Sequence, residues 1–203
     1  MRPTRLPHAL TISECHALVG VCRDADLRAL VAFLWASGCR INEALTLTWA
    51  SVNCEERKAI VRGKGDKERV VFFDAGTAVL LRGLCPGAPT TGKGPPGLLW
   101  GKSRQAYGLR LASAARRAGI EGMHFHLLRH SFATQMLEAG ANPIAVMDLM
   151  GHSKIDTLQT YAHITGPYLA ALRDSIGALP RCARFTLAHP DSHDDIARRQ
   201  RDL

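Results

Sequence analysis

The sequence predicts an α+β fold that is mainly α-helical and contains one small three-stranded antiparallel sheet. Apolar residues recur at helical spacing in several segments, and capping residues precede most of these segments. Only residues 49–73 contain short runs typical of strands, and a glycine-rich turn lies within them. A chain of 203 residues is long enough to bury a full hydrophobic core as one domain.

Three helices are expected in the first 45 residues. Thr11 is placed to cap the first helix, with Glu14 in its first turn. The second helix is expected over residues 24–37 and ends at Gly38. Its apolar residues fall on one stripe, namely Leu27, Leu30, Val31, Leu34 and Trp35. A short third helix is expected over residues 40–45.

The strands are expected near residues 49–53, 58–62 and 68–73. The segment Gly63–Lys67 joins the last two as a hairpin turn, because its glycines allow the left-handed backbone that tight turns require. Residues 85–97 are rich in Gly and Pro and predict a loop.

Helices dominate the second half of the chain. Ser103 is a candidate cap for a helix over residues 104–118. The next helix carries His126 and Arg129 and is expected to end near Gly140.

A further helix is expected to begin at Asn142-Pro143, an N-cap followed by proline in the first helical position, and to stop at Gly151. Residues 168–176 form a short amphipathic segment, and the last twenty or so residues predict a polar tail.

The charge favours a polyanionic partner. The chain carries 26 Lys and Arg against 18 Asp and Glu, a formal net charge of +8, and such a surface displaces the counterions condensed on nucleic acid. The six cysteines include no CxxC pair, which argues against a zinc ribbon or a redox dithiol. The sequence shows neither a signal peptide nor a long apolar run, so we expect a cytosolic protein outside the membrane.

One motif points to chemistry on an anion. His126 and Arg129 are three residues apart and share one face of a helix, so both can reach one phosphodiester. Tyr161 is a candidate nucleophile downstream. The alternative is an ordinary core helix with two polar residues at its edge.

Five segments together resemble the conserved blocks of the tyrosine recombinases, the phage-integrase and Xer-type enzymes. The resemblance covers roughly residues 5–178, and the blocks occur in the family's order. The matching segments are Gly38–Leu45, Gly63–Arg69, His126–Thr134, Leu149–Ser153 and Thr160–His163.

The resemblance implies a tyrosine-recombinase catalytic domain over residues 1–179, followed by the polar tail 180–203, with the family's N-terminal core-binding domain absent. It implies site-specific breakage and rejoining of DNA through a covalent 3′-phosphotyrosine, with no metal and no other cofactor. The catalytic residues would be Arg40, Lys64, His126, Arg129, His152 and Tyr161.

Physical reasons accompany each implied role. Arg40 and Arg129 can offer planar donor forks to the phosphate oxygens that gain charge, and Glu43 would orient Arg40 from one turn away. Tyr161 has a phenol whose pKa is near 10 in water, so neighbouring cations and a base must help to deprotonate it.

The remaining roles concern proton transfer. His126 would accept the proton of the nucleophile, and His152 would donate to a phosphoryl oxygen. Lys64 resembles the family's general acid, which protonates the departing 5′ oxygen. Its alternative is a solvated turn lysine like Lys67.

The implied partner is double-stranded DNA, bound by a protein that is monomeric when free and tetrameric in a synapse on DNA. Residues 168–176 would dock into a neighbouring protomer or pack within their own. The resemblance also places the protein in the cytoplasm, on the nucleoid of a bacterium or from a mobile element. Candidate DNA contacts are Lys67, Arg69, Arg104, Gln105, Arg110 and Arg116.

Three other functions compete. Residues 87–93 nearly match a phosphate-binding P-loop, but Gly94 offers no hydroxyl for magnesium. A metal site at His124, His126 and His130 lacks a well-placed carboxylate ligand. The stronger rival is a DNA-binding accessory module without strand exchange.

Overall fold

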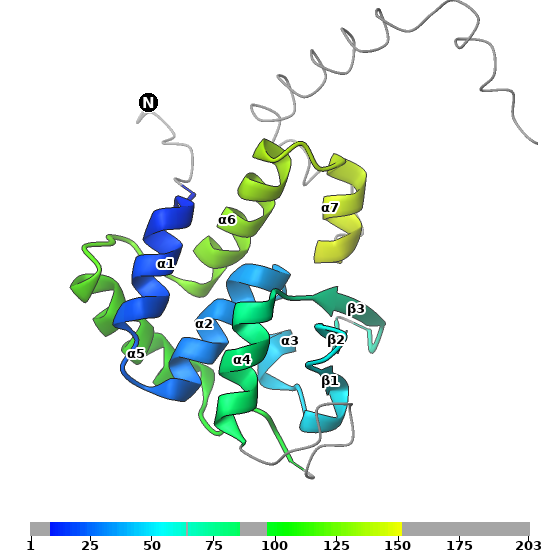
Figure 1. Ribbon diagram of the computed structural model, residues 1–203, viewed down its shortest axis with the longest axis horizontal. Coiled ribbons are helices and arrows are strands. Elements are labelled where there is room, and N and C mark those ends of the chain that lie inside the picture. The colour runs from blue at the N-terminus through cyan, green and yellow to red at the C-terminus, as the bar shows by residue number, and fades with distance from the viewer. Residues whose placement is uncertain (1–8, 64, 86–96, 152–203) are drawn as a thin grey trace, which may run out of the picture. The chain divides into compact units, whose positions relative to one another are not determined.

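The computed structural model describes residues 9–63, 65–85 and 97–151 of the chain. Most of these residues are helical, and one small sheet accounts for the strands, so the predicted fold class is confirmed (Figure 1). In chain order the elements are α1 (Ile12–Val21), α2 (Ala25–Ser37), α3 (Ile41–Leu45), the 3-10 helix η1 (Trp49–Ser51), β1 (Val52–Asn53), β2 (Lys58–Arg62), β3 (Glu68–Phe72), α4 (Ala75–Leu84), α5 (Arg104–Arg117), α6 (Phe125–Glu138) and α7 (Pro143–Met150).

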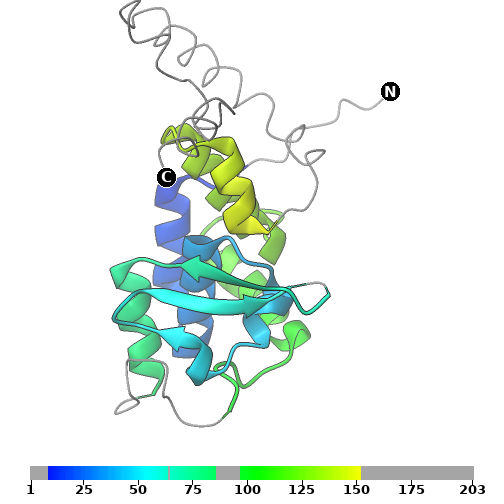
Figure 2. The ribbon, with the colours of Figure 1, turned by 90° about the vertical axis from the view of Figure 1, so that its right-hand side faces the viewer.

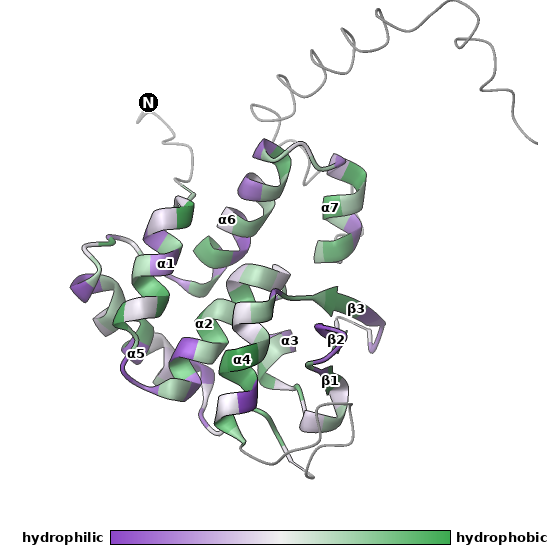
Figure 3. Ribbon diagram, viewed as in Figure 1, coloured by the Kyte–Doolittle hydropathy of each residue, from purple (hydrophilic) through white to green (hydrophobic). Residues whose placement is uncertain are grey.

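Helix α2 is the centre of the hydrophobic core. It packs against α1, α4, α5 and α6, and every residue from Ala29 to Leu34 is buried. The sequence predicted a single apolar stripe on this helix, but neighbours surround it, so burial extends around its circumference. Figure 3 shows hydrophobic colour along α4, one of the helices that cover α2.

The sheet has the strand order β1-β2-β3, and both pairs are antiparallel (Figure 2). Ala59 pairs with Val71 on the buried face, whereas Ile60 pairs with Val70 on a face where the two are 44% and 42% exposed. This alternation follows from the two-residue period of a strand. Strand β2 contacts α3 and β3 contacts α7, so the sheet adjoins two helices that carry predicted site segments.

The predicted hairpin turn joins β2 to β3. The amide of Gly63 donates to the carbonyl oxygen of Lys67 over 2.9 Å. Gly65 and Asp66 have φ angles of 77° and 57°, the left-handed conformation that favours glycine. The predicted turn is confirmed around Lys64, which itself lies outside the described residues.

Helix α4 was not predicted from the sequence. Asp74 caps the helix through Oδ1, which accepts from the amide of Thr77 over 2.8 Å. Ala78 and Leu81 are buried in the core that α2 organises. Packing of this apolar face offsets the cost of Gly76 and Gly83 within the helix.

The predicted helix starts are confirmed at three caps. The hydroxyl of Thr11 accepts from the amide of Glu14, whose carboxylate accepts from the amide of Thr11 in return. Ser103 caps α5 through the amide of Ala106, and Asn142 caps α7, in which Pro143 is the first residue.

Two further expectations fall on undescribed parts of the chain. The amphipathic segment 168–176 and the boundary at residue 179, with the polar tail 180–203, lie outside the described residues. Within the three described ranges, no helix combines the length and the apolar character needed to cross a membrane.

Candidate active site

A cavity of about 560 Å³ lies where α3, α5 and α6 approach one another. It brings together three arginines and two histidines from three separate parts of the sequence. These are Arg40, Arg104, Arg129, His124 and His126. Three of the six predicted catalytic residues therefore share one cavity. We call this cavity the cationic groove.

Arg40 is the N-cap residue of α3 and is held by Glu43. Its amide donates to Glu43 Oε2 over 2.8 Å, and its Nη1 donates to Glu43 Oε1 over 2.9 Å. The side chain of Arg40 remains 41% exposed at the wall of the groove. The geometry thus agrees with the expectation that Glu43 orients Arg40, and the arginine stays accessible to an anion.

The carboxylate of Glu43 also binds a second arginine, a contact that the sequence did not suggest. Arg69 donates from Nη1 to Oε1 over 3.0 Å and from Nη2 to Oε2 over 2.7 Å. Burial alone would raise the pKa of Glu43, but the hydrogen bonds from Arg69 and Arg40 outweigh burial and lower the pKa to about 2. Glu43 is therefore a carboxylate at every physiological pH.

Arg129 is buried on α6, and its guanidinium joins two distant segments of backbone. Nη1 donates to the carbonyl oxygen of Gly38 over 2.6 Å, and Nη2 donates to that of Met150 over 2.8 Å. Burial, followed by the positive charge of Arg40, lowers the pKa of Arg129 to about 10. The side chain is still charged at neutral pH, so it supplies a fixed positive charge beside the groove.

His126 lies in the first turn of α6, one turn before Arg129. Partial burial lowers its pKa, and the positive charges of Arg129, Arg40 and Arg104 lower it further. The ring is consequently neutral near pH 7, and a neutral imidazole can accept a proton.

His124 has a structural role that the sequence did not reveal. It is the N-cap of α6, and its Nδ1 accepts from the amide of Leu127 over 3.1 Å. Among the residues that the structure describes, no group of three or more His, Cys, Asp or Glu side chains could hold a metal ion.

The predicted DNA contacts fall in two environments. Lys67, Arg104, Gln105 and Arg116 are exposed. Arg69 and Arg110 already bind protein groups: Arg69 binds Glu43 and the carbonyl oxygen of Leu149, and Arg110 Nη1 lies 3.4 Å from Asp24 Oδ2. Contact with DNA stays a prediction for all six residues.

Arg104 and Arg116 stand at opposite ends of α5. Twelve residues of helix separate them, a distance of about 18 Å at 1.5 Å per residue. Arg104 lines the cationic groove, whereas Arg116 lines a different hollow near Gly119 and Met123. If both contact a duplex, they reach different phosphates.

Three predicted catalytic residues, Lys64, His152 and Tyr161, lie outside the described residues. Their nearest described neighbours in the chain are Gly63 and Gly151, and both belong to the region around Glu43 and Arg69. The structure therefore shows the positions of the residues that immediately precede Lys64 and His152.

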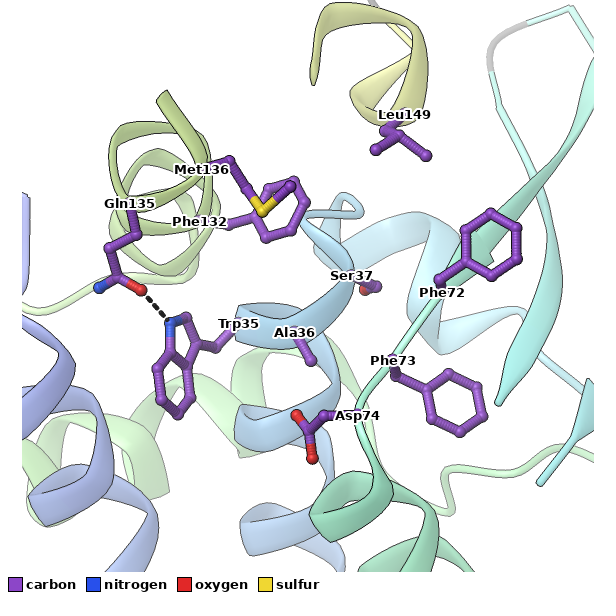
Figure 4. A pocket seen from close by; sticks show the side chains of 10 residues that line it. All are labelled: Trp35, Ala36, Ser37, Phe72, Phe73, Asp74, Phe132, Gln135, Met136 and Leu149. Atoms are coloured by element: carbon purple, nitrogen blue, oxygen red, sulfur yellow. Dashed lines mark hydrogen bonds between the residues drawn. The ribbon is translucent and has the colours of Figure 1, made fainter. Parts of the chain in front are cut away.

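A second cavity, of about 450 Å³, lies beside β3 and between the end of α2 and α6 (Figure 4). Its wall is largely apolar and includes Phe72, Phe132, Met136 and Leu149. Trp35 stands at its edge, where Nε1 donates to Gln135 Oε1 over 2.8 Å. None of the residues predicted to act in catalysis lines this cavity among those described.

The chain is similar in sequence to known proteins. The sequence model described as the phage integrase family matches residues 8–166. Tyrosine recombinase XerC of Xanthomonas axonopodis pv. citri (strain 306) is 35% identical over 190 residues, which cover 90% of this chain and 62% of the relative. The chain thus spans about three fifths of the length of the curated relatives it matches.

Solved structures show the same fold. The crystal structure of XerA recombinase superimposes with a TM-score of 0.68 at 26% identity, covering 89% of this chain and 67% of that one. The XerH site-specific recombinase, in a post-cleavage complex with palindromic difH substrate, superimposes with a TM-score of 0.65 at 26% identity, covering 83% of this chain and 53% of that one.

Proposed function

Because the chain belongs to the phage integrase family, the tyrosine recombinases, we propose that it breaks and rejoins DNA at specific sites through a covalent 3′-phosphotyrosine. The observation that carries this proposal is the cationic groove, in which Arg40, His126 and Arg129 meet. Two arginines and a neutral histidine suit an attack on a phosphodiester, which needs both charge stabilisation and a proton acceptor.

The described residues supply the electrostatic part of the reaction. Negative charge grows on the non-bridging oxygens as the phosphorus becomes five-coordinate. Arg40, exposed in the groove and already oriented by Glu43, is placed to donate to these oxygens. Arg129 contributes a positive charge that two backbone carbonyls hold in place. Such preorganisation removes the cost of orienting donors during the reaction.

The covalent steps involve residues beyond the described ranges. The phenolic oxygen of Tyr161 forms a bond to phosphorus while the bond from phosphorus to the 5′ oxygen breaks. His126 accepts the proton of the phenol, Lys64 gives a proton to the departing 5′ oxygen, and His152 donates to a phosphoryl oxygen. Attack of a 5′ hydroxyl on the phosphotyrosine reverses the sequence and reseals a strand. The scheme balances without a metal ion or a nucleotide cofactor.

The partner we propose is duplex DNA. XerH, a relative in fold, was solved with its difH substrate, and this chain carries a net charge of +8. We further propose that the free protein is a monomer, that four copies assemble on two DNA sites, and that residues 168–176 contact a neighbouring protomer in that assembly.

A nicked suicide DNA substrate tests the chemistry. Strand cleavage releases a short fragment from such a substrate, so the covalent intermediate accumulates. We expect a protein–DNA adduct that survives denaturation, forms equally well in EDTA and is lost in Tyr161→Phe. Specific DNA binding without an adduct would instead support the accessory-module function, and loss of the adduct in EDTA would support a metal-dependent reaction.

A further inference from the structure

We propose that Arg69 is a positioning residue. Together with Glu43 it fixes the positions, relative to Arg40, of the chain segments that lead into Lys64 and His152. The inference rests on the proposed function and assigns Arg69 a role other than DNA contact. Arg69 lies on the second strand of the hairpin, and the segment that contains Gly151 is some 80 residues away in sequence.

The first support is the pairing of Arg69 with Glu43. The two side chains form a paired fork, in which Nη1 of Arg69 donates to Oε1 of Glu43 over 3.0 Å and Nη2 donates to Oε2 over 2.7 Å. The side chain of Arg69 is 16% exposed and that of Glu43 is 6% exposed. Paired forks of this kind fix orientation as well as distance, and a lysine cannot reproduce them.

The second support is the approach of Arg69 to Gly151. A methyl group built on Gly151 would lie 2.8 Å from Nη1 of Arg69 and 2.9 Å from both Cζ and Nε, so the guanidinium lies directly against this backbone. Nε of Arg69 also donates to the carbonyl oxygen of Leu149 over 3.1 Å. This bond satisfies a carbonyl at the C-terminal end of α7, where positive charge is favourable. His152 is the next residue after Gly151.

The third support is on the other side of the same ion pair. A methyl group built on Gly63 would lie 3.5 Å from Glu43 Oε1 and 3.6 Å from Arg69 Nη1, which is ordinary van der Waals contact. The amide of Gly63 closes the hairpin by donating to the carbonyl oxygen of Lys67. Lys64 is the next residue after Gly63.

One ion pair therefore lies beside three segments that carry predicted catalytic residues. Glu43 holds Arg40 directly, while a methyl group added at Gly63 or Gly151, immediately before Lys64 and His152, would meet the pair. Nε, Nη1 and Nη2 of Arg69 each donate to a protein oxygen. These bonds use three of the five N–H groups of Arg69, and its side chain is only 16% exposed. A positioning role therefore accounts for the geometry better than a DNA contact does.

The test compares Arg69→Gln and Arg69→Lys with Arg62→Gln. Arg62 is a matched control because it lies on the same hairpin and pairs with Glu68 through Nε at 2.9 Å, but the two side chains are 65% and 51% exposed. Two quantities are measured for each variant: the single-turnover rate of adduct formation at saturating suicide DNA, and the Kd for uncleaved DNA at several salt concentrations.

We expect Arg69→Gln to lower the cleavage rate about 100-fold, the order of loss that misplacement of catalytic groups by 1 Å produces, while its Kd stays within about twofold of wild type, as for a residue that contacts no phosphate. Arg69→Lys should recover only part of the rate, because it restores charge but not the fork. Arg62→Gln should leave both quantities unchanged.

Hydrogen exchange provides a readout that does not depend on activity. In both Arg69 variants the amides of Gly63 and Gly151 should exchange faster than in wild type, while amides of the α2 core keep their protection. Unchanged exchange at both glycines overturns the inference, as does a variant with weaker DNA binding, a smaller salt slope and a normal cleavage rate. A wild-type protein that forms no adduct overturns the proposed function, and the exchange comparison still decides the positioning role.

Discussion

The guanidinium of Arg129 donates a hydrogen bond to the carbonyl oxygen of Gly38 over 2.6 Å, across 91 positions of sequence. Gly38 ends α2 in the left-handed conformation, and Arg40 follows two residues later. The loop that precedes Arg40 is therefore hydrogen-bonded to the helix that carries Arg129. This bond contributes to the placement of Arg40 and Arg129 relative to each other.

Gly38→Ala should destabilise the protein by about 2–4 kcal/mol, because an L side chain is strained in the left-handed conformation and overpacks its neighbour. The added methyl group would lie 2.2 Å from Cδ1 of Phe132, and φ at Gly38 is 61°. Urea denaturation measures the loss. The control is Gly20→Ala, where no atom lies within 4 Å of the added methyl group and replacing a helical glycine stabilises by up to about 1 kcal/mol. Equal effects at the two sites would contradict the prediction.

Glu43→Gln should cost about 3–5 kcal/mol of stability at pH 7, the range for breaking a buried ion pair on one side. The substitution leaves Arg40 and Arg69 without their shared counter-charge at a site that is 6% exposed. Glu68→Gln is the matched control, since it breaks an exposed pair on the same hairpin and should cost at most about 1 kcal/mol. Comparable losses of unfolding free energy in the two variants would show that the buried pair stabilises the fold no more than the exposed pair does.

The stability that Glu43 provides should depend on pH in a defined direction. Folding lowers the pKa of this carboxyl from 4.5 to about 2, so the unfolded chain binds the proton more readily between these values. The contribution is therefore complete above about pH 4.5 and disappears as the pH falls toward 2. Denaturation of wild type and Glu43→Gln from pH 7 down to pH 2.5 should show the two free energies of unfolding converging. A constant difference between them would refute the assignment.

Gly151→Ala should be more damaging than Gly63→Ala. Gly151 has φ 67° and its added methyl group would lie 2.8 Å from Arg69, whereas at Gly63 the nearest atom is 3.5 Å away. We expect a loss of about 1–3 kcal/mol at Gly151, from backbone strain and displacement of the guanidinium, and less than about 0.5 kcal/mol at Gly63. Thermal unfolding of the two variants measures the difference, and a larger loss at Gly63 would contradict it.

His126, the proposed proton acceptor, should have a pKa below the ordinary value for histidine. Burial and the positive charges of Arg129, Arg40 and Arg104 lower the pKa of His126, so its acid limb in single-turnover cleavage should have a midpoint below about 6.5. Arg104→Gln removes one of those charges and should raise the midpoint, while Arg116→Gln at the far end of α5 should leave it unchanged. NMR titration of the His126 ring follows the same proton. A wild-type midpoint above 6.5 would contradict the assignment.

Local signals in the sequence predicted much of the fold. Thr11, Ser103 and Asn142 were recognisable as caps because their side chains bond amides two or three residues away, within the same short segment. Residues 49–53 were expected to form a strand, but Trp49–Ser51 form a 3-10 helix and only Val52–Asn53 pair with β2. Strands β2 and β3 and the turn between them were predictable for the same reason as the caps. Local chemistry determines them, and tertiary packing only reinforces it.

Features that depend on tertiary contacts were not predictable. Helix α4 contains Gly76 and Gly83, and its stability comes from packing in the core that α2 organises, which no local pattern reveals. The cap at His124 uses a ring nitrogen instead of the usual short side-chain oxygen. Arg69 was interpreted only as a candidate DNA contact, because its partners, Glu43 and Leu149, are 26 and 80 positions away.

Leu10, just before α1, is tied to α6 at both of its backbone polar groups. Its amide donates to Ser131 Oγ over 2.8 Å, and its carbonyl oxygen accepts from Gln135 Nε2 over 2.8 Å. In mechanical terms this residue is an anchor point on the helix that carries His126 and Arg129. Tension or torque applied to the polypeptide before Leu10 is therefore transmitted to that helix, and a fusion partner or surface attachment placed there acts on the helix that carries Arg129, a predicted catalytic residue.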